Sequence, residues 1–240
     1  MYKKSLVLTI AIAVNSATAQ SNTVNFIDTS FDLAGYSSET FQTGGASINT
    51  SQTLTSGNPG AGIQSLINVP SYNGTFYTRE YYINSLWSYD PGTQGAINTL
   101  DVSTDLYFDF QPGPLQALGV VYLLRQSGNY YIHTTTLPVV NATWQTGSES
   151  GLSLNDFGLV SNLLTGTTDF TSNPDSTSGE IELGFLMGTY VTGSSAQSID
   201  YRLDNLSYTV SSVPIPASLW LLSSALVALL GFKRNKIGNS

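Results

Sequence analysis

The densest group of residues with binding chemistry is a run of aromatic side chains in the first half of the chain. Six tyrosine and tryptophan residues fall within the eighteen positions from 72 to 89: Tyr72, Tyr77, Tyr81, Tyr82, Trp87 and Tyr89. An aromatic ring has an apolar face and, in Tyr and Trp, a polar atom at its edge, so it can stack on a sugar ring and also hydrogen-bond to it. The candidate glycan-binding residues are therefore Tyr77, Tyr81, Tyr82, Trp87 and Tyr89. Packing in the core would explain part of this run without any ligand.

Oxygen-bearing side chains suggest a second candidate site near the end of the chain. Asp200, Asp204 and Asn205 could supply the oxygen ligands that a structural calcium ion requires. Asp and Asn also cap turns, and that role fits these positions equally well. By contrast, Asp101, Asp105 and Asp109 follow each other at about 13 Å along one strand face, which is too far apart for one ion, so we predict a solvated face there. The sequence predicts no other cofactor.

The sequence contains no strong catalytic motif. His133 is the only histidine, there is no cysteine, and the sequence contains neither a Gly-x-Ser-x-Gly elbow nor a His-Glu-x-x-His motif. A glycosidase needs only two carboxylates, and Glu80, Glu149, Glu180 or Glu182 could in principle form such a pair. Nothing in their spacing indicates it. We predict that the protein is not an enzyme, with a glycan-active enzyme of the same fold as the alternative.

Charge is distributed unevenly along the 240 residues. Five of the eight basic residues lie near the ends, so the part between them holds three arginines and all sixteen acidic residues, a net charge of −13 (3 − 16). Such a surface repels nucleic acid. It suits cations, neutral glycans or cationic partners, although acidity also keeps a protein soluble.

Alternating apolar and polar residues predict that the middle of the chain is made of β-strands. The alternation is clear over residues 101–110, 181–191 and 199–210, and it changes phase near Asp204, which indicates a β-bulge. Residues 118–126 and 130–136 flank Ser127-Gly128-Asn129 as a hairpin. No helix is evident apart from a turn or two near residues 152–164. The predicted fold is all-β, an antiparallel two-sheet β-sandwich, with a helix at each end of the chain.

The N-terminus has the pattern of a secretory signal peptide. Two lysines precede an apolar run that ends at Val14, and Ala17-Thr18-Ala19 provides the small-x-small pattern of a cleavage site. We expect cleavage between Ala19 and Gln20, which gives a signal peptide at residues 1–19 and a domain at residues 20–212.

The C-terminus has the pattern of a membrane anchor. Two prolines precede an uncharged apolar stretch, residues 217–232, which as a helix would rise about 24 Å, slightly less than a hydrocarbon core. The basic residues that follow should remain cytoplasmic and leave the domain outside the inner membrane. These stop-transfer residues are Lys233, Arg234 and Lys236.

This tail, residues 213–240, resembles the PEP-CTERM sorting signal in its Val-Pro-Leu-Pro-Ala variant. The motif is carried here by Val213, Pro214, Ile215, Pro216 and Ala217, followed by the apolar span and the basic residues. The resemblance implies an exosortase partner, a transient stay in the inner membrane, and transfer to the envelope or exopolysaccharide matrix of a Gram-negative bacterium. A plain, permanent membrane anchor is the alternative.

The domain also resembles the jelly-roll, concanavalin-type domains of exported bacterial proteins. The resemblance is carried by residues 87–91 and 95–97, Trp144, residues 152–157, residues 178–185 and Asp204-Asn205. It implies glycan binding or a structural calcium. The sequence thus predicts an exported structural or carbohydrate-binding component of the cell surface or biofilm matrix, with exopolysaccharide as a partner. A membrane-anchored periplasmic adhesin is the remaining alternative.

Overall fold

A computed structural model describes residues 22–71, 74–111, 116–118, 121–134, 142–193 and 195–213. The predicted signal peptide with Ala17, Ala19 and Gln20, and the tail from Pro214 onward, lie outside the described residues. Within the described part, no helix is long and apolar enough to cross a membrane. The predicted membrane span, residues 217–232, lies outside the described residues.

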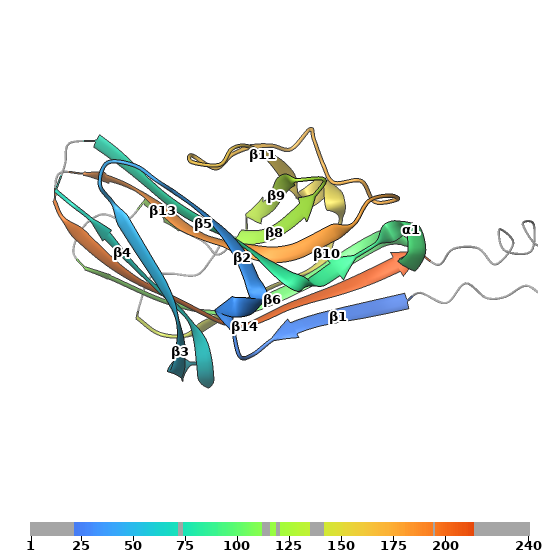
Figure 1. Ribbon diagram of the computed structural model, residues 1–240, viewed down its shortest axis with the longest axis horizontal. Coiled ribbons are helices and arrows are strands. Elements are labelled where there is room, and N and C mark those ends of the chain that lie inside the picture. The colour runs from blue at the N-terminus through green and yellow to red at the C-terminus, as the bar shows by residue number, and fades with distance from the viewer. Residues whose placement is uncertain are drawn as a thin grey trace, which may run out of the picture. The chain divides into compact units, whose positions relative to one another are not determined.

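The described strands form two antiparallel sheets that pack as a sandwich (Figure 1). In the six-stranded sheet the order is β10-β6-β14-β4-β3, and β1 also pairs with β14. Its strands are β1 (Asn22–Asp28), β3 (Ser47–Gly57), β4 (Gly60–Val69), β6 (Ala96–Gln111), β10 (Gln145–Leu152) and β14 (Gln197–Val213). The predicted all-β, two-sheet antiparallel sandwich is therefore confirmed.

In the eight-stranded sheet the order is β12-β11-β9-β8-β13-β5-β2, and β7 also pairs with β13. Its strands are β2 (Tyr36–Gln42), β5 (Gly74–Tyr89), β7 (Gln116–Leu118), β8 (Val121–Gln126), β9 (Asn129–Thr134), β11 (Gly158–Asn162), β12 (Thr167–Asp169) and β13 (Ile181–Gly193). The short helical turns are η1 (Leu33–Gly35), α1 (Pro91–Gln94) and η2 (Leu154–Asp156). The last of these accounts for the helical turn expected near residues 152–164.

The strands predicted from alternation are present with the expected buried faces. On β13 the side chains of Ile181, Leu183, Phe185, Met187 and Val191 are all buried. The hairpin between β8 and β9 turns at Ser127-Gly128, where both residues have positive φ (52° and 79°) as a tight two-residue turn requires. One expectation fails, because Asp105 is buried rather than part of a solvated face.

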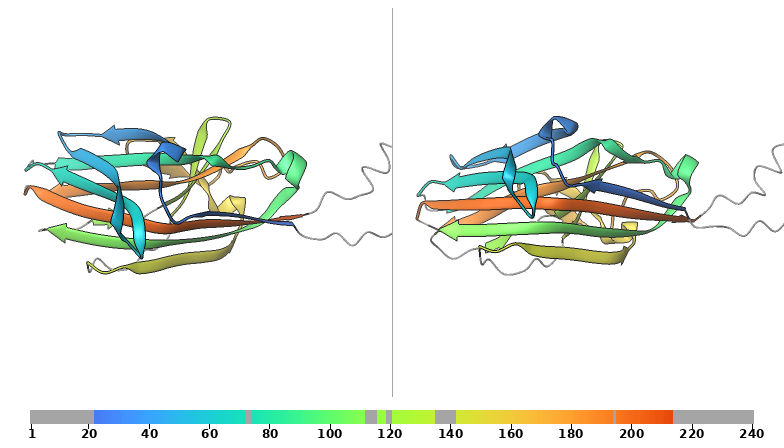
Figure 2. Two further views of the ribbon diagram at one scale, coloured as in Figure 1. Left: turned by 60° about the horizontal axis from the view of Figure 1, so that its bottom comes forward. Right: turned by 90° about the horizontal axis from the view of Figure 1, so that it is seen from below.

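Strand β14 changes face at a β-bulge. Its register with β6 shifts between Asp204 and Ser207, and Asn205 adopts a left-handed conformation with φ 51°. Before the bulge Tyr201 and Leu203 point inward, and after it Leu206, Tyr208 and Val210 do. The bulge also divides the other edge of the strand, which pairs with β4 before it and with β1 after it (Figure 2).

Tyr208 connects the two sheets through its hydroxyl group. The side chain extends from β14 across the core, and its hydroxyl donates to the Gly184 carbonyl of β13 at 2.5 Å while it accepts from the Leu123 amide of β8 at 3.0 Å. The ring itself is fully buried between Trp87 and Tyr122, edge-on to both. Gly184 is required beside it because a Cβ at that position would collide with the carbonyl oxygen of Tyr82.

Replacing Tyr208 with Phe removes this bridge and leaves buried backbone groups without their partner. We expect Tyr208→Phe to lower the free energy of unfolding by about 1–3 kcal/mol, measured by urea denaturation. Tyr190→Phe is the matched control, because Tyr190 is half-buried on β13 and its hydroxyl has no partner among the described residues. Equal stability of the two variants would contradict a structural role for the Tyr208 hydroxyl.

Candidate functional site

The predicted aromatic cluster does not form an exposed platform. Tyr81, Tyr82, Trp87 and Tyr89 are 0%, 5%, 7% and 0% exposed, so they belong to the core. Tyr82 stacks on Phe185 with ring centroids 4.8 Å apart. The expectation that these four rings bind a glycan at the surface is therefore wrong.

The physical reason is that β5 is covered on both faces. Tyr82 faces the six-stranded sheet, whereas Tyr81 packs on the opposite side in a second apolar cluster with residues of β8, β9 and β13. The turn after β11 lies over that cluster, where the Leu163 carbonyl accepts a hydrogen bond from the Tyr81 hydroxyl at 2.8 Å. Tyr77 is half-buried, with its ring 6.2 Å from that of Tyr190. Tyr72 lies outside the described residues.

An accessible group of aromatic and polar side chains lies instead on the outer face of the six-stranded sheet. The register sets Tyr107 of β6 opposite Arg202 of β14, Arg202 opposite Gln64 of β4, and Gln64 opposite Ser51 of β3. Trp144 precedes β10, and its ring lies 5.8 Å from that of Tyr107 at 53°. We call Trp144, Tyr107, Arg202, Gln64 and Ser51 the cross-strand row. At a strand spacing of about 4.8 Å it is roughly 19 Å long.

The centre of the cross-strand row is held in place by ionic and cation–π contacts. The Arg202 guanidinium lies 4.6 Å from the centroid of the Tyr107 ring. It donates from Nε and Nη2 to the two oxygens of Asp200, at 3.1 and 2.5 Å, and this bond raises the pKa of Arg202. Gln64 donates to the same carboxylate at 2.9 Å. The side chains of Arg202 and Asp200 remain 24% and 21% exposed, so a ligand can reach them.

This arrangement suits a sugar ring. Tyr107 and Trp144 offer partly exposed rings for stacking. The planar guanidinium and amide next to them have further N–H donors, and carboxylate oxygens accept several hydrogen bonds each. Because these groups already fix each other, little side-chain entropy is lost when a ligand binds.

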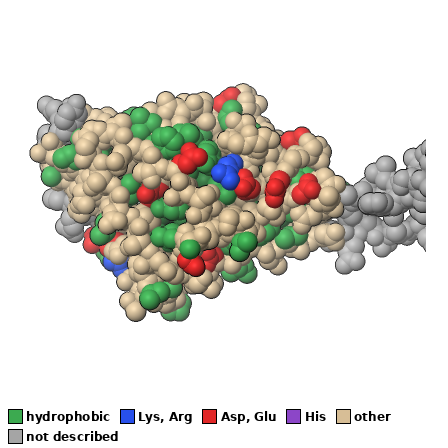
Figure 3. Space-filling model, in the orientation of Figure 1, with side chains coloured by type: hydrophobic (Ala, Val, Ile, Leu, Met, Phe, Trp, Pro, Cys, Tyr) green, Lys and Arg blue, Asp and Glu red, His purple; other side chains and the backbone are tan. Residues whose placement is uncertain are grey.

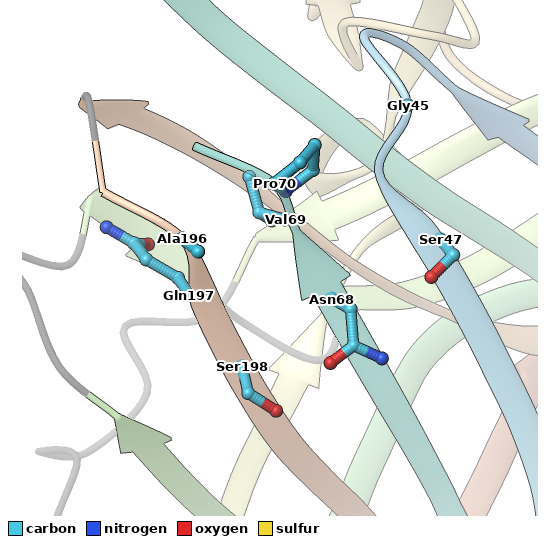
Figure 4. Close-up of a pocket in the computed structure, with 8 residues that line it drawn as sticks. All are labelled: Gly45, Ser47, Asn68, Val69, Pro70, Ala196, Gln197 and Ser198. Atoms are coloured by element: carbon cyan, nitrogen blue, oxygen red, sulfur yellow. The ribbon is translucent and has the colours of Figure 1, made fainter. Parts of the chain in front are cut away.

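Two shallow depressions extend the same face in both directions. One, of about 480 Å³, lies at the ends of β3, β4 and β14, where Ser47, Asn68 and Ser198 sit side by side (Figure 4). The other, of about 310 Å³, lies over β10, β6 and β14 and is polar. Its lining includes Asp101, Ser103, Ser148, Ser207 and Thr209. The cross-strand row lies between them.

The candidate metal ligands do not converge. The Asp200 carboxylate is bound to Arg202 and Gln64, as described above. Asp204 accepts from the backbone amides of Asn58 and Asn205, the latter at 2.7 Å. The Asn205 side chain donates to Asp105 Oδ2 at 2.7 Å and to the Asn58 carbonyl at 2.6 Å. Among the described residues no group of three or more His, Cys, Asp or Glu side chains is placed to hold an ion. Asp204 and Asn205 thus serve the bulge and the β3–β4 turn, in agreement with the turn-capping alternative.

The candidate catalytic carboxylates have separate structural roles. Glu80 is buried between the sheets and accepts from the hydroxyls of Tyr82 at 2.8 Å and Thr40 at 3.2 Å. Glu149 contacts Nε2 of His133 at 2.7 Å, whose Nδ1 faces the Asp156 carbonyl. Glu182 forms a two-bond ion pair with Arg125. None of these three carboxylates shares a partner with another.

Sequence reasoning missed the row because its members are far apart in the chain. Tyr107 was placed correctly on the polar side of the strand at residues 101–110, where an aromatic side chain among aspartates was the available signal. Trp144 and Arg202 become neighbours of Tyr107 only through the pairing of β10, β6 and β14.

Comparison with known proteins finds similarity to solved structures at a low level. No protein-family model and no curated protein matches the chain. Among solved structures, a family 11 carbohydrate-binding module of the cellulosomal cellulase Lic26A-Cel5E of Clostridium thermocellum is 14% identical (TM-score 0.42) and aligns over 77% of this chain and 94% of its own.

Two further structures are similar at the same level. The family 11 module from Clostridium thermocellum in complex with a β-1,3-1,4-mixed-linked tetrasaccharide is 13% identical over 80% of this chain and 98% of its own (TM-score 0.45). The CBM22-1 xylan-binding domain of Paenibacillus barcinonensis Xyn10C is 10% identical over 81% and 97% (TM-score 0.35). With TM-scores below 0.5, none of these alignments assigns a ligand or a residue role to this chain.

The buried carboxylate of Asp204, against the β3–β4 turn, gives a prediction for acid titration. Burial raises the pKa of Asp204, and the neighbouring Asp105 and Asp28 carboxylates raise it further. Hydrogen bonds from the backbone amides of Asn58 and Asn205 act in the opposite direction and lower it. Its folded pKa thus lies above the unfolded value of about 3.9, so the free energy of unfolding falls as the pH rises through the folded pKa.

Carboxyl ¹³C NMR titration should therefore find the midpoint of Asp204 above about 3.9. Asp175 is the internal control, because hydrogen bonds from the Ser178 hydroxyl and from Thr177 lower its pKa to about 2. A midpoint for Asp204 at or below that of an ordinary aspartate would show that the β3–β4 turn does not desolvate it.

Proposed function

We propose that the protein is an exported, non-catalytic carbohydrate-binding component of the cell envelope or exopolysaccharide matrix, and that the cross-strand row is its binding site. The observation that carries the proposal is the contact among the partly exposed side chains of Trp144, just before β10, Tyr107 on β6 and Arg202 on β14. Rings alone would suit many apolar partners. Rings beside a fixed guanidinium–carboxylate pair offer both stacking and directed hydrogen bonds, which is what a sugar ring requires.

The open form of the face favours a polymer over a single sugar. The row crosses four strands and ends at Trp144, the residue before β10. One mainly apolar and one polar depression continue it along the strands on the two sides. An enclosed pocket for a small ligand buries most of the ligand surface. Here the polar groups are spread along the sheet instead, so several sugar units can be contacted at once.

The position of the row also suits a tethered protein. Asn22 and Ser212 are register partners, so both described ends of the chain lie at one end of the sandwich (Figure 1). Arg202 lies eleven residues before Val213 on β14, which corresponds to about 36 Å along the strand. A polysaccharide could therefore reach the row while the chain is still anchored through its C-terminus.

We further propose that the tail is a PEP-CTERM-type signal of the Val-Pro-Leu-Pro-Ala variant, processed by an exosortase, and that the domain is related to the jelly-roll, concanavalin-type domains. Support for sorting comes from the sequence, in which Pro214, Ile215 and Pro216 precede an apolar span and a basic end. Strand β14 ends at Val213, so the motif begins where the last strand ends.

Removing rings from the row should weaken polysaccharide binding. We expect Tyr107→Ala and Trp144→Ala each to reduce affinity by roughly tenfold, a typical loss for a central aromatic contact, measured by affinity electrophoresis in soluble polysaccharides. Arg202→Ala should have a comparable effect because it frees the Tyr107 ring and the Asp200 carboxylate. Phe170→Ala, which removes a half-exposed ring in the turn after β12 of the other sheet, is the control. Retained binding in all three row variants would rule out this face.

Processing at both ends can be tested independently of binding. The mature protein from its own host should have lost residues 1–19 and the apolar tail, and the tail should be retained when the exosortase gene is deleted. Intact-mass spectrometry distinguishes the two forms. A tail present in both strains would contradict exosortase sorting and would favour a permanently anchored protein.

A further inference from the structure

We infer that the cross-strand row binds an uncharged polysaccharide and rejects polymers that carry carboxylate or sulfate groups. This inference rests on the proposed function and specifies the ligand class of the same site. It follows from where the few cationic groups of the domain lie and from what they already contact.

Every cationic side chain between residues 21 and 214 already has partners. That segment contains only Arg79, Arg125 and Arg202 and no lysine. Arg79 donates to the Leu164 and Thr165 carbonyls on the outer side of the other sheet, at 3.2 and 2.8 Å. Arg125 holds Glu182 with bonds of 2.6 and 2.7 Å. Arg202, the one cation on the binding face, uses two donors on Asp200.

Acidic groups dominate the same face. Asp101, Asp109 and Asp200 all project outward and are at least partly exposed. Asp105 and Asp204, register partners on the same two strands, are buried. In the view of Figure 3 the acidic side chains are scattered over the surface, and the few basic ones lie next to acidic ones. An anionic polymer would have to approach a domain of net charge −13, and like charges near an interface are costly.

Neutral hydrogen-bonding groups occupy many of the other positions of the face, next to the exposed Leu66. Ser51 and Gln64 belong to the row itself. Further hydroxyls and an amide flank the row on both sides: Ser47, Asn68, Ser103, Ser148, Ser207 and Thr209. These groups can both donate and accept, as sugar hydroxyls do. Aspartates near the row, by contrast, already accept internal bonds: Asp105 from the Thr146 hydroxyl at 2.5 Å and Asp101 from the Gly151 amide at 2.7 Å. They do not form an open receptor for an ammonium group either.

The test compares chemically matched polymers with the full-length chain. Affinity electrophoresis is run in mixed-linkage β-glucan, galactomannan and hydroxyethylcellulose, and then in the same polymers after oxidation of their primary hydroxyls to carboxylates. A second pair, glycol chitin and its deacetylated ammonium form, tests positive charge. We expect the oxidised form of any bound polymer to bind at least about tenfold more weakly. The difference should shrink near 1 M salt, where the screening length is about 3 Å.

A designed variant tests whether an added positive charge improves binding of the oxidised polymer. Ser51 is exposed at the end of the row, and Ser51→Lys should recover several-fold affinity for the oxidised polymer, whereas the uncharged Ser51→Gln should not. Three outcomes would overturn the inference and leave glycan binding intact. They are equal or tighter binding of the oxidised polymers, tighter binding of the ammonium form, and no gain in affinity with Ser51→Lys. Failure of every polymer, neutral or charged, to bind would instead overturn the proposed function itself.

Discussion

The architecture depends on one contact, the insertion of the Tyr208 hydroxyl between two strands of the opposite sheet. A phenol that hydrogen-bonds to the Gly184 carbonyl and the Leu123 amide fixes the distance and the relative register of the two sheets. Apolar packing alone is not directional and would allow the sheets to slide. The lack of a side chain at Gly184 also lets β13 lie close to the backbone of β5 at the same position. Other polar groups, such as Glu80 with the hydroxyl donors Tyr82 and Thr40, also lie in the interior between the two sheets.

The bulge at Asp204 allows Tyr208 to point inward, and it also organises the outer face. Without the extra residue, the inward alternation of Tyr201 and Leu203 would continue at odd positions and turn Tyr208 toward solvent. The turn between β3 and β4 folds against the bulge, where the Asn205 side chain donates to the Asn58 carbonyl. Asn58 donates its backbone N–H to Asp204, and Asn205 donates its side-chain amide to Asp105. Arg202, two residues before the bulge, is thereby held opposite Tyr107. The core and the candidate site therefore depend on the same irregularity.

Alternation in the sequence was sufficient to predict the strands over residues 101–110, 181–191 and 199–210 and the bulge, because a strand with one buried face alternates whatever its neighbours are. For residues 76–89 it offered no guidance, because β5 is buried on both faces. The aromatic residues of β5 have the same types whether they pack inside or bind a ligand outside. The row is a different case. Trp144, Tyr107 and Arg202 are individually ordinary, and only the strand order β10-β6-β14 makes them neighbours. Strand order across a sheet depends on long-range packing, which no local pattern reports.

The low charge content of the domain has a consequence for how it could bind. With three arginines, each already engaged, affinity cannot come from ionic attraction and must come from stacking, from hydrogen bonds and from the number of sugar units contacted. Such contacts are weak individually, so a repeating polymer gains most from a long open face, where release of one unit leaves others bound. A pocket would give up this advantage. An open row across four strands, extended by a depression on each side, is therefore a geometry through which an acidic, disulfide-free domain could hold a neutral polymer.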